Sequence, residues 1–530
     1  MLETARSYRG MVTAPHRLAA QAGLGVLKEG GNAIEAMIAA ASTIAVVYPH
    51  MNALGGDNFW LIHEPGGEAM GIDACGGAAA RAEIAYYRER GLTEIPSRGP
   101  LAALTVAGAV SGWQAALEIS AERWGGRLPL TRLLEDAAFY AGDGIAATRN
   151  FAANSRAKLE ELKDVPGFAE TYLNQGRPHA EGARLRQPRL ARTLARLGER
   201  GLDDFYRGEL ARVIAADLER AGSPLALADL ERHRALRVVP LALEVAGHRV
   251  FSMPPPTQGL AALILLGVFE RLGVTEAEGF EFVHGLVEAG KAAFRVRDRH
   301  VTDPAYMTVA PESFLTASAL DDMAAQVDRR RAAPWPEAAP GGDTVWLGAI
   351  DGEGRAVSFI QSLYWEFGSG TVLEDSGLTW QNRGTSFSLD ERHHNCLKPH
   401  RRPFHTILPA LARLADGRVM VYGTMGGEGQ PQTQAAVFTR HVLYGQDLQR
   451  ALTAPRWLLG RTWGAATTTL KLENRFDPAL IAALRAAGHE LEVLGPFDEI
   501  MGHAGALVHH TEGLIEGASD PRSDGAALGI

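Results

Sequence analysis

The fold of this chain is decided by the segment Gly341-Gly342-Asp343-Thr344-Val345-Trp346-Leu347-Gly348-Ala349-Ile350-Asp351-Gly352-Glu353-Gly354-Arg355-Ala356-Val357-Ser358-Phe359-Ile360-Gln361-Ser362. Residues 334–342 are rich in Pro and Gly, so they neither continue a helix nor complete a strand ladder. The β-prone residues that follow, with Gly and Asp at the turn, predict a hairpin. A regular hairpin centred on Glu353 places residue 344 opposite residue 362, so the hydroxyl groups of Thr344 and Ser362 should lie close together.

The surroundings of Thr344 suit a nucleophile that becomes a new N-terminus when the chain cleaves itself. It opens a strand, it has a second hydroxyl opposite, and a pliable segment precedes it. A chain that cuts itself just before Thr344 would free an α-amine, which would then serve as the base for the Thr hydroxyl. The alternative is an ordinary Thr at the start of an ordinary strand. From these residues alone that alternative is favoured, because Gly-Asp-Thr is a common sequence.

Length and composition indicate a soluble globular enzyme. The 530 residues suggest about three domains, or one large α/β unit with additions. Hydrophobic residues make up 46% of the chain and charged residues 22%, which is ordinary for this class. The net charge of -9 is mild and no basic block is present, so we expect no nucleic-acid partner.

The cysteines and the N-terminus argue for a cytoplasmic protein. The two cysteines, Cys75 and Cys396, are far apart in sequence; they could pair in principle, but they form neither a disulfide framework nor a zinc spacing. The first residues lack the basic and apolar regions of a signal peptide. No window reaches the run of about 18 apolar residues that a membrane helix needs, so we expect no membrane contact.

A His-rich loop raises the question of a metal. The spacing of its side chains matches no standard zinc site, and Pro399 and Pro403 lie within the segment. We therefore expect neither a metal nor another cofactor. The potential ligands are His393, His394, Cys396, His400 and His405.

The remaining patterns predict an alternation of helices and strands. Helices are expected at residues 18–28 and 32–47, the second capped by Asn32, and residues 106–333 read as mostly helical. A second hairpin at residues 408–423 leads into Gly426-Gly427. Successive glycines between a strand and a helix expose backbone N–H groups that stabilise an anion. In an amide hydrolase that anion would be the oxyanion; the alternative is a simple glycine turn.

Taken together, these pieces resemble the γ-glutamyltransferase (glutathione hydrolase) family of N-terminal nucleophile hydrolases over nearly the whole chain. Each motif is weak alone, but their ordered series is specific. The motifs are Gly30-Gly31-Asn32-Ala33, Pro49-His50, Leu54-Gly55-Gly56, Met253-Pro254-Pro255-Pro256, the Thr344 hairpin with Asp351, Gly354, Ala356 and Val357, Phe367-Gly368-Ser369-Gly370, Arg402-Pro403, Met425-Gly426-Gly427, Ala454-Pro455-Arg456 and Ser519-Asp520-Pro521-Arg522-Ser523.

The resemblance implies an α/β fold, the four-layer α/β/β/α sandwich of that superfamily, and a precursor that cleaves itself between Asp343 and Thr344. A large chain, residues 1–343, and a small chain, residues 344–530, would stay associated. Thr344 would be the nucleophile and, through its α-amine, the base, since such an amine has a pKa near 7.7–8.0. Ser362 matches the hydroxyl that contacts the nucleophile, and Gly426 and Gly427 match the oxyanion-hole glycines.

The chain departs from the glutamate-selective members of the family. Those members hold the substrate α-carboxylate and α-amine with an Arg, an Asn, an acid and a serine pair. Most of that clamp is missing here, and a site without its charged partners loses selectivity for the charged group. The corresponding residues are Cys75 for the Arg, Tyr364 for the Asn, Ser386 for the acid, His405 and Thr406 for the serines, and Arg383 for a Gln that follows Asn382.

Arg383 is the informative departure. It places a bidentate donor where a carboxylate close to the scissile amide would lie. Gln381-Asn382-Arg383-Gly384 and Tyr364 are similar to the oxamate amidohydrolase branch of the family, which implies a small carboxylate-bearing amide as substrate. We assign substrate binding to Arg383, Tyr364, Asn382, His405 and Thr406.

Three alternatives stay open at this point. Arg383 could form a structural salt bridge. The enzyme could be a glutathione hydrolase or γ-glutamyl transpeptidase with a rebuilt pocket, or the chain could be an unprocessed, non-catalytic binding protein on the same fold. The sequence does not decide between hydrolysis and transfer, nor whether processed units form a homodimer.

Overall fold

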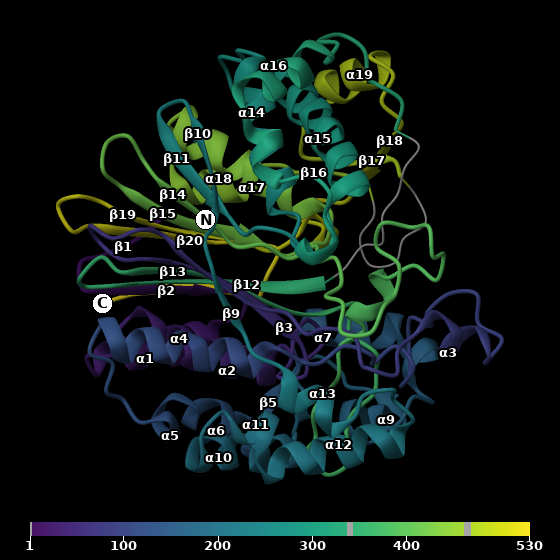
Figure 1. The fold of residues 1–530 in the computed structure, drawn as a ribbon. Coiled ribbons are helices and arrows are strands. Elements are labelled where there is room, and N and C mark those ends of the chain that lie inside the picture. The colour runs from purple at the N-terminus through teal and green to yellow at the C-terminus, as the bar shows by residue number, and fades with distance from the viewer. Residues whose placement is uncertain (1–2, 336–342, 461–467) are drawn as a thin grey trace.

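The computed structural model describes residues 3–335, 343–460 and 468–530, and in them two seven-stranded sheets lie face to face (Figure 1). Neighbouring strands are antiparallel in both sheets. In order across the first sheet, the strands are β1 (Ala5–Ser7), β20 (Ile515–Ser519), β19 (Ala504–His509), β15 (Val419–Thr424), β14 (Ala410–Arg413), β11 (His248–Ser252) and β10 (Leu241–Val245). The second has β21 (Ala526–Gly529), β2 (Gly10–Ala14), β12 (Asp343–Asp351), β13 (Ala356–Tyr364), β3 (Asp57–His63), β4 (Met70–Ala74) and β9 (Leu236–Val238).

The predicted central hairpin is formed by β12 and β13. Val345 pairs with Gln361 and Ile350 with Ala356, which is the register expected for a hairpin centred on Glu353. An irregularity follows towards the start of β12, where Asp343 pairs with Tyr364. Most of the Pro- and Gly-rich segment predicted before it, residues 336–342, lies outside the described residues.

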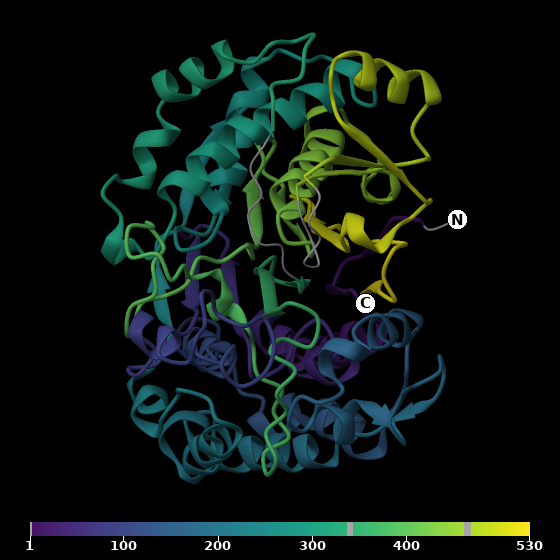
Figure 2. The same cartoon turned by 90° about the vertical axis from the view of Figure 1, so that its right-hand side faces the viewer.

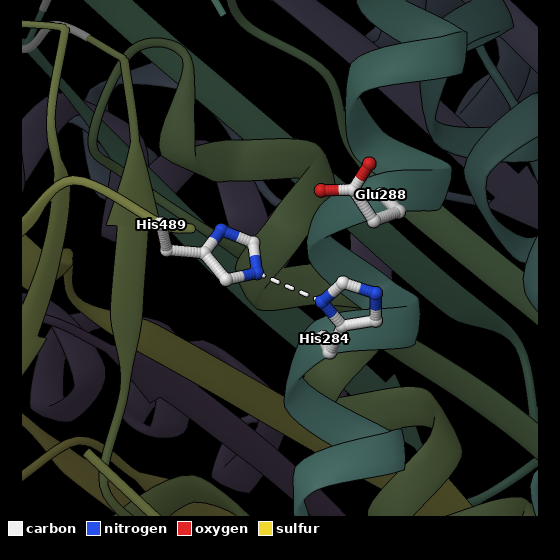
Figure 3. Close-up of side chains that lie close together, drawn as sticks. All are labelled: His284, Glu288 and His489. Atoms are coloured by element: carbon white, nitrogen blue, oxygen red, sulfur yellow. Dashed lines mark hydrogen bonds between the residues drawn. The ribbon is translucent and has the colours of Figure 1, made fainter. Parts of the chain in front are cut away.

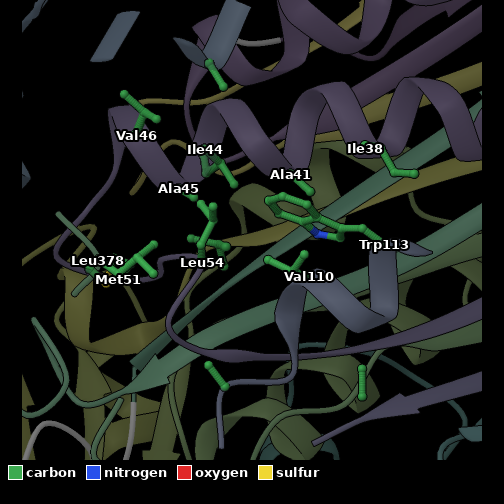
Figure 4. Packing of buried hydrophobic residues seen from close by; sticks show 14 of the residues in the cluster. Ile38, Ala41, Ile44, Ala45, Val46, Met51, Leu54, Val110, Trp113 and Leu378 are labelled. Atoms are coloured by element: carbon green, nitrogen blue, oxygen red, sulfur yellow. The ribbon is translucent and has the colours of Figure 1, made fainter. Parts of the chain in front are cut away.

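Helices α1 (Arg17–Lys28), α2 (Ala33–Val47) and α4 (Ala109–Arg123) cover the outer face of the second sheet (Figure 1). Asn32 caps α2 as predicted: its Oδ1 accepts from the N–H groups of Ile34 and Glu35, and the Glu35 carboxylate accepts from the Asn32 N–H. All fifteen residues of α2 are buried. Its many alanines allow close packing, and Figure 4 shows Trp113 of α4 lying beside Ala41 of α2.

A further group of helices lies below these, as drawn in Figure 1. Within the segment expected to be mostly helical, the helical periodicity runs without a break from residue 203 to 221, but the structure divides this stretch at Gly208, whose backbone is extended. A Cβ there would meet the Asp204 carboxylate at 1.8 Å. The elements between residues 84 and 232, apart from α4, are α3 (Ile84–Arg88), α5 (Leu130–Leu133), α6 (Glu135–Asp143), β5 (Ile145–Ala146), α7 (Arg149–Ala157), α8 (Leu159–Leu162), α9 (Phe168–Tyr172), β6 (Leu173–Asn174), β7 (Arg177–Pro178), β8 (Arg184–Leu185), α10 (Pro188–Arg200), α11 (Asp204–Arg207), α12 (Glu209–Ala221) and α13 (Leu227–Arg232).

The fourth layer covers the outer face of the first sheet (Figures 1 and 2). The architecture is therefore the predicted α/β/β/α sandwich. Within the described residues, no helix combines the length and apolar character that crossing a bilayer requires. The elements of this layer and the remaining short ones are α14 (Gly259–Arg271), α15 (Phe280–His300), η1 (Pro304–Tyr306), η2 (Pro311–Leu315), α16 (Ala317–Ala325), η3 (Arg383–Ser386), α17 (Gly429–Phe438), the π-helix η4 (Thr439–Leu443), α18 (Leu448–Thr453), β16 (Trp457–Leu459), β17 (Leu470–Glu473), α19 (Pro478–Ala486), β18 (Leu491–Leu494) and η5 (Glu499–Met501).

Candidate active site

Thr344 and Ser362 lie side by side near one end of the β12–β13 hairpin. The Thr344 Oγ1 donates to the Ser362 Oγ over 3.3 Å, and both residues are buried. The Ser362 Oγ also accepts from the Tyr364 N–H at 2.8 Å, which fixes its rotamer. Tyr364 has a φ of 85°, a left-handed conformation that costs energy in a non-glycine residue. The hairpin therefore holds two hydroxyl groups together beside a strained backbone.

The turn before β3 packs directly against the backbone of Ser362. A Cβ on Gly56 would lie 2.1 Å from the Ser362 carbonyl oxygen, and one on Gly55 would lie 2.0 Å from the Thr379 carbonyl oxygen. Only glycine fits such close approaches. The sequence motif Leu54-Gly55-Gly56 thus has a steric reason in the positioning of the hairpin.

Arg383, in η3, reaches Ser362, one of the two residues of this hydroxyl pair. Its Nη2 donates to the Ser362 Oγ at 3.5 Å and its Nη1 to the Thr406 Oγ1 at 3.3 Å. The guanidinium carbon lies 3.9 Å from the centre of the Tyr364 ring, a cation–π contact. Arg383 is 1% exposed, its Nε has no hydrogen-bond partner, and within the described chain no ion pair joins it to a carboxylate.

This environment leaves a buried positive charge that the protein only weakly compensates. Burial lowers the pKa of Arg383 to about 10, while Tyr364, Asp57 and Cys75 act in the opposite direction. The group therefore stays charged near neutral pH. A buried cation with two long hydrogen bonds is suited to receive an anion. The structural salt bridge considered as an alternative is not formed among the described residues.

Asp57, at the start of β3, interacts electrostatically with this cation. Its Oδ1 accepts from the N–H groups of Gly108 at 2.9 Å and Gly76 at 3.1 Å. Its Oδ2 lies 3.6 Å from the His405 Nε2. Burial raises the pKa of Asp57 to about 7, against the effect of Arg383 and of the two N–H groups. Burial, with Arg383 and Arg402, holds the pKa of His405 well below its usual range, so that imidazole is neutral.

The Gly426-Gly427 turn lies between β15 and α17. Gly426 has a φ of 116° and Gly427 a φ of 52°, both left-handed conformations. Gln430, in the first turn of α17, extends its Nε2 to the Thr344 Oγ1 at 3.5 Å. Its Oε1 accepts from the Leu408 N–H at 3.1 Å, which fixes the orientation of the amide. The glycine turn and Thr344 are thus brought together through Gln430.

The other substrate-binding candidates lie around this centre in different roles. Thr406 and His405 are buried and contact Arg383 and Asp57 respectively. Asn382 is bonded differently: its Oδ1 accepts from the Trp365 N–H at 3.1 Å and its Nδ2 donates to the Ser97 carbonyl at 2.9 Å. Its side chain therefore braces the backbone next to Arg383. Sequence reasoning missed Asp57 and Gln430, whose only sequence signals were adjacent glycines.

The His-rich loop forms no group of three metal-ligating side chains within the described ranges. Cys75 and Cys396 are free, buried thiols. One such group lies elsewhere, where His284 and Glu288 of α15 meet His489 (Figure 3). His284 Nδ1 and His489 Nε2 are 2.8 Å apart, and Glu288 accepts from Lys291 Nζ at 2.7 Å and from the Ala333 N–H at 3.0 Å. The Glu288 carboxylate is already bonded to Lys291, and His284 Nε2 lies 2.8 Å from the Asp328 carbonyl oxygen. We therefore interpret this cluster as a structural contact between α15 and residues 328–333.

Comparison with known proteins places the geometry in a family. A family model described as Gamma-glutamyltranspeptidase matches residues 19–530. The chain is 55% identical over 523 residues, 99% of each protein, to the oxamate amidohydrolase proenzyme of Klebsiella pneumoniae. It is 40% identical over 522 residues, 98% of each protein, to the glutathione hydrolase-like YwrD proenzyme of Bacillus subtilis. The crystal structure of cephalosporin acylase from Bacillus halodurans superposes with a TM-score of 0.92 at 33% identity, covering 100% of this chain and 97% of that one. The chain therefore belongs to the gamma-glutamyltranspeptidase family of N-terminal nucleophile hydrolases, and it is an enzyme.

Proposed function

We propose that this enzyme is made as a precursor, cleaves itself between Asp343 and Thr344, and hydrolyses the amide of a small carboxylate-bearing substrate such as oxamate. The observation that carries the proposal is the buried, weakly bonded Arg383 guanidinium, one hydroxyl group away from Thr344. The relatives named proenzymes, among them the oxamate amidohydrolase of Klebsiella pneumoniae, support it.

The proposed reaction begins with the Thr344 Oγ1. The oxygen attacks the amide carbon while its proton passes to the α-amine of the new N-terminus. The tetrahedral oxyanion is held by N–H groups of Gly426 and Gly427, and one donor in such a site lowers the barrier by about 2.7–4 kcal/mol. The carbon–nitrogen bond then breaks, and the α-amine returns the proton to the departing ammonia. Water hydrolyses the resulting ester and regenerates Thr344.

The position of Arg383 favours a short substrate. In oxamate the carboxylate is bonded directly to the amide carbon, so it must lie next to the nucleophile. Arg383 is 3.5 Å from the Ser362 Oγ, which is itself 3.3 Å from the Thr344 Oγ1, so its fork can reach such a carboxylate. A γ-glutamyl carboxylate is separated from its amide by three further carbons. It would need a charged partner farther from the nucleophile, and the positions that match such partners in the glutamate-selective members hold Cys75 and Ser386 here.

Processing is tested on a denaturing gel followed by N-terminal sequencing. We expect two chains, the smaller starting Thr-Val-Trp, from the wild-type and the Thr344→Ser variant, and a single 56.8 kDa band from Thr344→Ala. Thr344→Ser is the matched control because it keeps the hydroxyl group. Normal cleavage of Thr344→Ala would refute the mechanism, and an uncleaved wild-type chain would favour the non-catalytic binding protein.

The substrate is tested by ammonia release from oxamate, measured beside the turnover of γ-glutamyl-p-nitroanilide. We expect the processed enzyme to hydrolyse oxamate with the higher kcat/KM. Rapid turnover of the glutamyl compound without turnover of oxamate would instead assign the enzyme as a glutathione hydrolase or transpeptidase.

A further inference from the structure

The Gly426-Gly427 turn is hydrogen-bonded by the side chain of Gln258, the residue immediately before α14. The Gln258 Nε2 donates to the Gly427 carbonyl oxygen at 2.8 Å and also to the Thr406 carbonyl oxygen. Gln258 is fully buried and lies more than 160 residues from the turn in sequence. The Gln258 amide therefore links the glycine turn to the segment that contains Thr406, whose hydroxyl accepts from Arg383.

The orientation of the Gln258 amide is fixed by Arg297 of α15. Arg297 Nη1 donates to the Gln258 Oε1 at 2.9 Å, so the Nε2 must face the two carbonyl oxygens. Its Nη2 donates to the Glu428 Oε1 at 3.1 Å. Arg297 is 1% exposed, and Glu428 and Asp298 compensate its charge. The Arg297 guanidinium thus contacts both Gln258, which binds the Gly427 carbonyl, and Glu428, the residue that follows Gly427.

Two successive glycines need such support. Without a Cβ, their backbone dihedrals have more freedom than those of other residues, so hydrogen bonds from neighbouring groups matter more in fixing them. The Gly426 carbonyl accepts from the Gly429 N–H at 2.8 Å within the turn. The Gly427 carbonyl accepts a longer bond from the Gln430 N–H, at 3.3 Å, and a shorter one from the Gln258 Nε2, at 2.8 Å. The Gly426 carbonyl shares its peptide plane with the Gly427 N–H, and the Gly427 carbonyl shares its plane with the Glu428 N–H. Gln258 therefore acts on the turn by fixing the peptide plane that follows Gly427, and with it the ψ angle of Gly427.

We propose that Gln258, oriented by Arg297, is a positioning residue for the amide hydrolysis: it holds the Gly426-Gly427 turn so that its N–H groups face the oxyanion. This inference rests on the proposed function, because it takes the glycine pair as the oxyanion site. Neither side chain touches the substrate in this scheme. Their effect falls on the transition state, where the oxyanion forms, and not on substrate binding.

The test is the variant Gln258→Glu, which keeps the size of the side chain and the acceptor for Arg297 but removes the donor to Gly427. We expect kcat for the amide to fall about 10- to 100-fold with KM changed less than about twofold, below the 10²–10³ lost with a whole oxyanion donor. Arg297→Lys keeps the positive charge but loses the two-pronged guanidinium, and it should lower kcat in the same way. It replaces Gln258→Glu as the test if that variant does not cleave itself.

The matched control is Gln187→Glu. Gln187 is another buried glutamine whose Nε2 donates to a backbone carbonyl, that of Val46, at 2.9 Å, and it lies in the helical region below the second sheet. Its variant should lose a similar amount of thermal stability and keep its kcat. A loss of stability alone therefore cannot imitate the expected result.

The outcomes separate this inference from the proposed function. A processed Gln258→Glu enzyme with normal kcat, or with only a raised KM, would overturn the inference and leave the proposed function intact. Failure of both Gln258→Glu and Arg297→Lys to cleave, with the fold retained, would also overturn it, since the pair would then serve self-cleavage. A processed wild-type chain that hydrolyses no amide would count against the proposed function itself.

Discussion

Replacing Arg383 by Met separates a substrate-binding arginine from a structural one. Met has a similar length, is neutral and fits an irregular buried space. The substitution removes both Nη donors that we expect to bind the substrate carboxylate. Removing one partner of a buried, hydrogen-bonded charge pair costs about 2–5 kcal/mol. Since about 1.4 kcal/mol corresponds to a factor of ten, kcat/KM should fall roughly 30- to 3,000-fold.

The same substitution should not destabilise the protein without substrate. Among the described residues, Arg383 makes only two long hydrogen bonds, at 3.3 and 3.5 Å, and its stacking on Tyr364 contributes about 0.5–2 kcal/mol. Against that stands the penalty for burying a charge that no carboxylate pairs, and removing the charge relieves it. The two effects are of similar size, so we expect the midpoint of thermal unfolding to stay the same or to rise.

Arg440 provides the contrasting control. It is equally buried, but it donates to Glu278 at 2.7 and 2.9 Å and to the Pro455 carbonyl at 2.9 Å. Arg440→Met should therefore lower the unfolding midpoint and leave kcat/KM unchanged in the processed enzyme. The measurements are ammonia release from oxamate and differential scanning calorimetry. An Arg383→Met enzyme that loses stability and keeps its kcat/KM would refute the reasoning and make Arg383 a structural residue.

Three further expectations concern the pH response, the nucleophile and the fold. Burial raises the pKa of Asp57 to about 7, so below that pH it is neutral and leaves Arg383 uncompensated, while above it the carboxylate competes with the substrate for Arg383. The KM for oxamate should therefore rise from pH 6 to pH 8, and Asp57→Asn should remove the rise; a pH-dependent KM in that variant would contradict the assignment. Gln430→Leu removes the donor to the Thr344 Oγ1 and, at about 1 kcal/mol for a hydrogen bond, should lower kcat about fivefold without changing KM. Asn32→Ala removes the cap of α2 and should lower the free energy of unfolding by about 0.5–2 kcal/mol with activity retained, as measured by denaturant titration after processing.

The fold could be predicted to the extent that its signals are local. The capping box of α2 and the register of the β12–β13 hairpin both follow from a few adjacent residues, and both are observed. The break at Gly208 was missed because the helical periodicity continues across it, whereas the close approach of the Asp204 carboxylate, which leaves no room for a Cβ at residue 208, exists only in the folded chain. The irregular pairing of Asp343 with Tyr364 likewise depends on backbone geometry that the pattern does not contain.

The site could be predicted only where a motif marks the residue. Thr344 and Ser362 face each other because they share one hairpin, so counting along the strands was enough to pair them. Gln430 and Asp57 come from α17 and β3, and no sequence motif marks either side chain. Their roles follow from their burial and from the residues that surround them in the folded chain. An aspartate acquires a pKa of about 7 here through burial, a property that no sequence pattern records.

The placement of charge relative to Thr344 explains how one fold serves different amides. A nucleophile, a neighbouring hydroxyl and a glycine turn act on the amide group itself, so they are indifferent to the rest of the substrate. What selects the substrate is the distance from the nucleophile to the first uncompensated charge. In this chain that charge is Arg383, which contacts the hydroxyl next to Thr344, while the position expected to bind a more distant carboxylate holds Cys75, whose pKa burial raises well above the ordinary value. A neutral thiol attracts no carboxylate, so the only strong anchor near Thr344 in the described part of the site suits an acid whose carboxylate adjoins its amide.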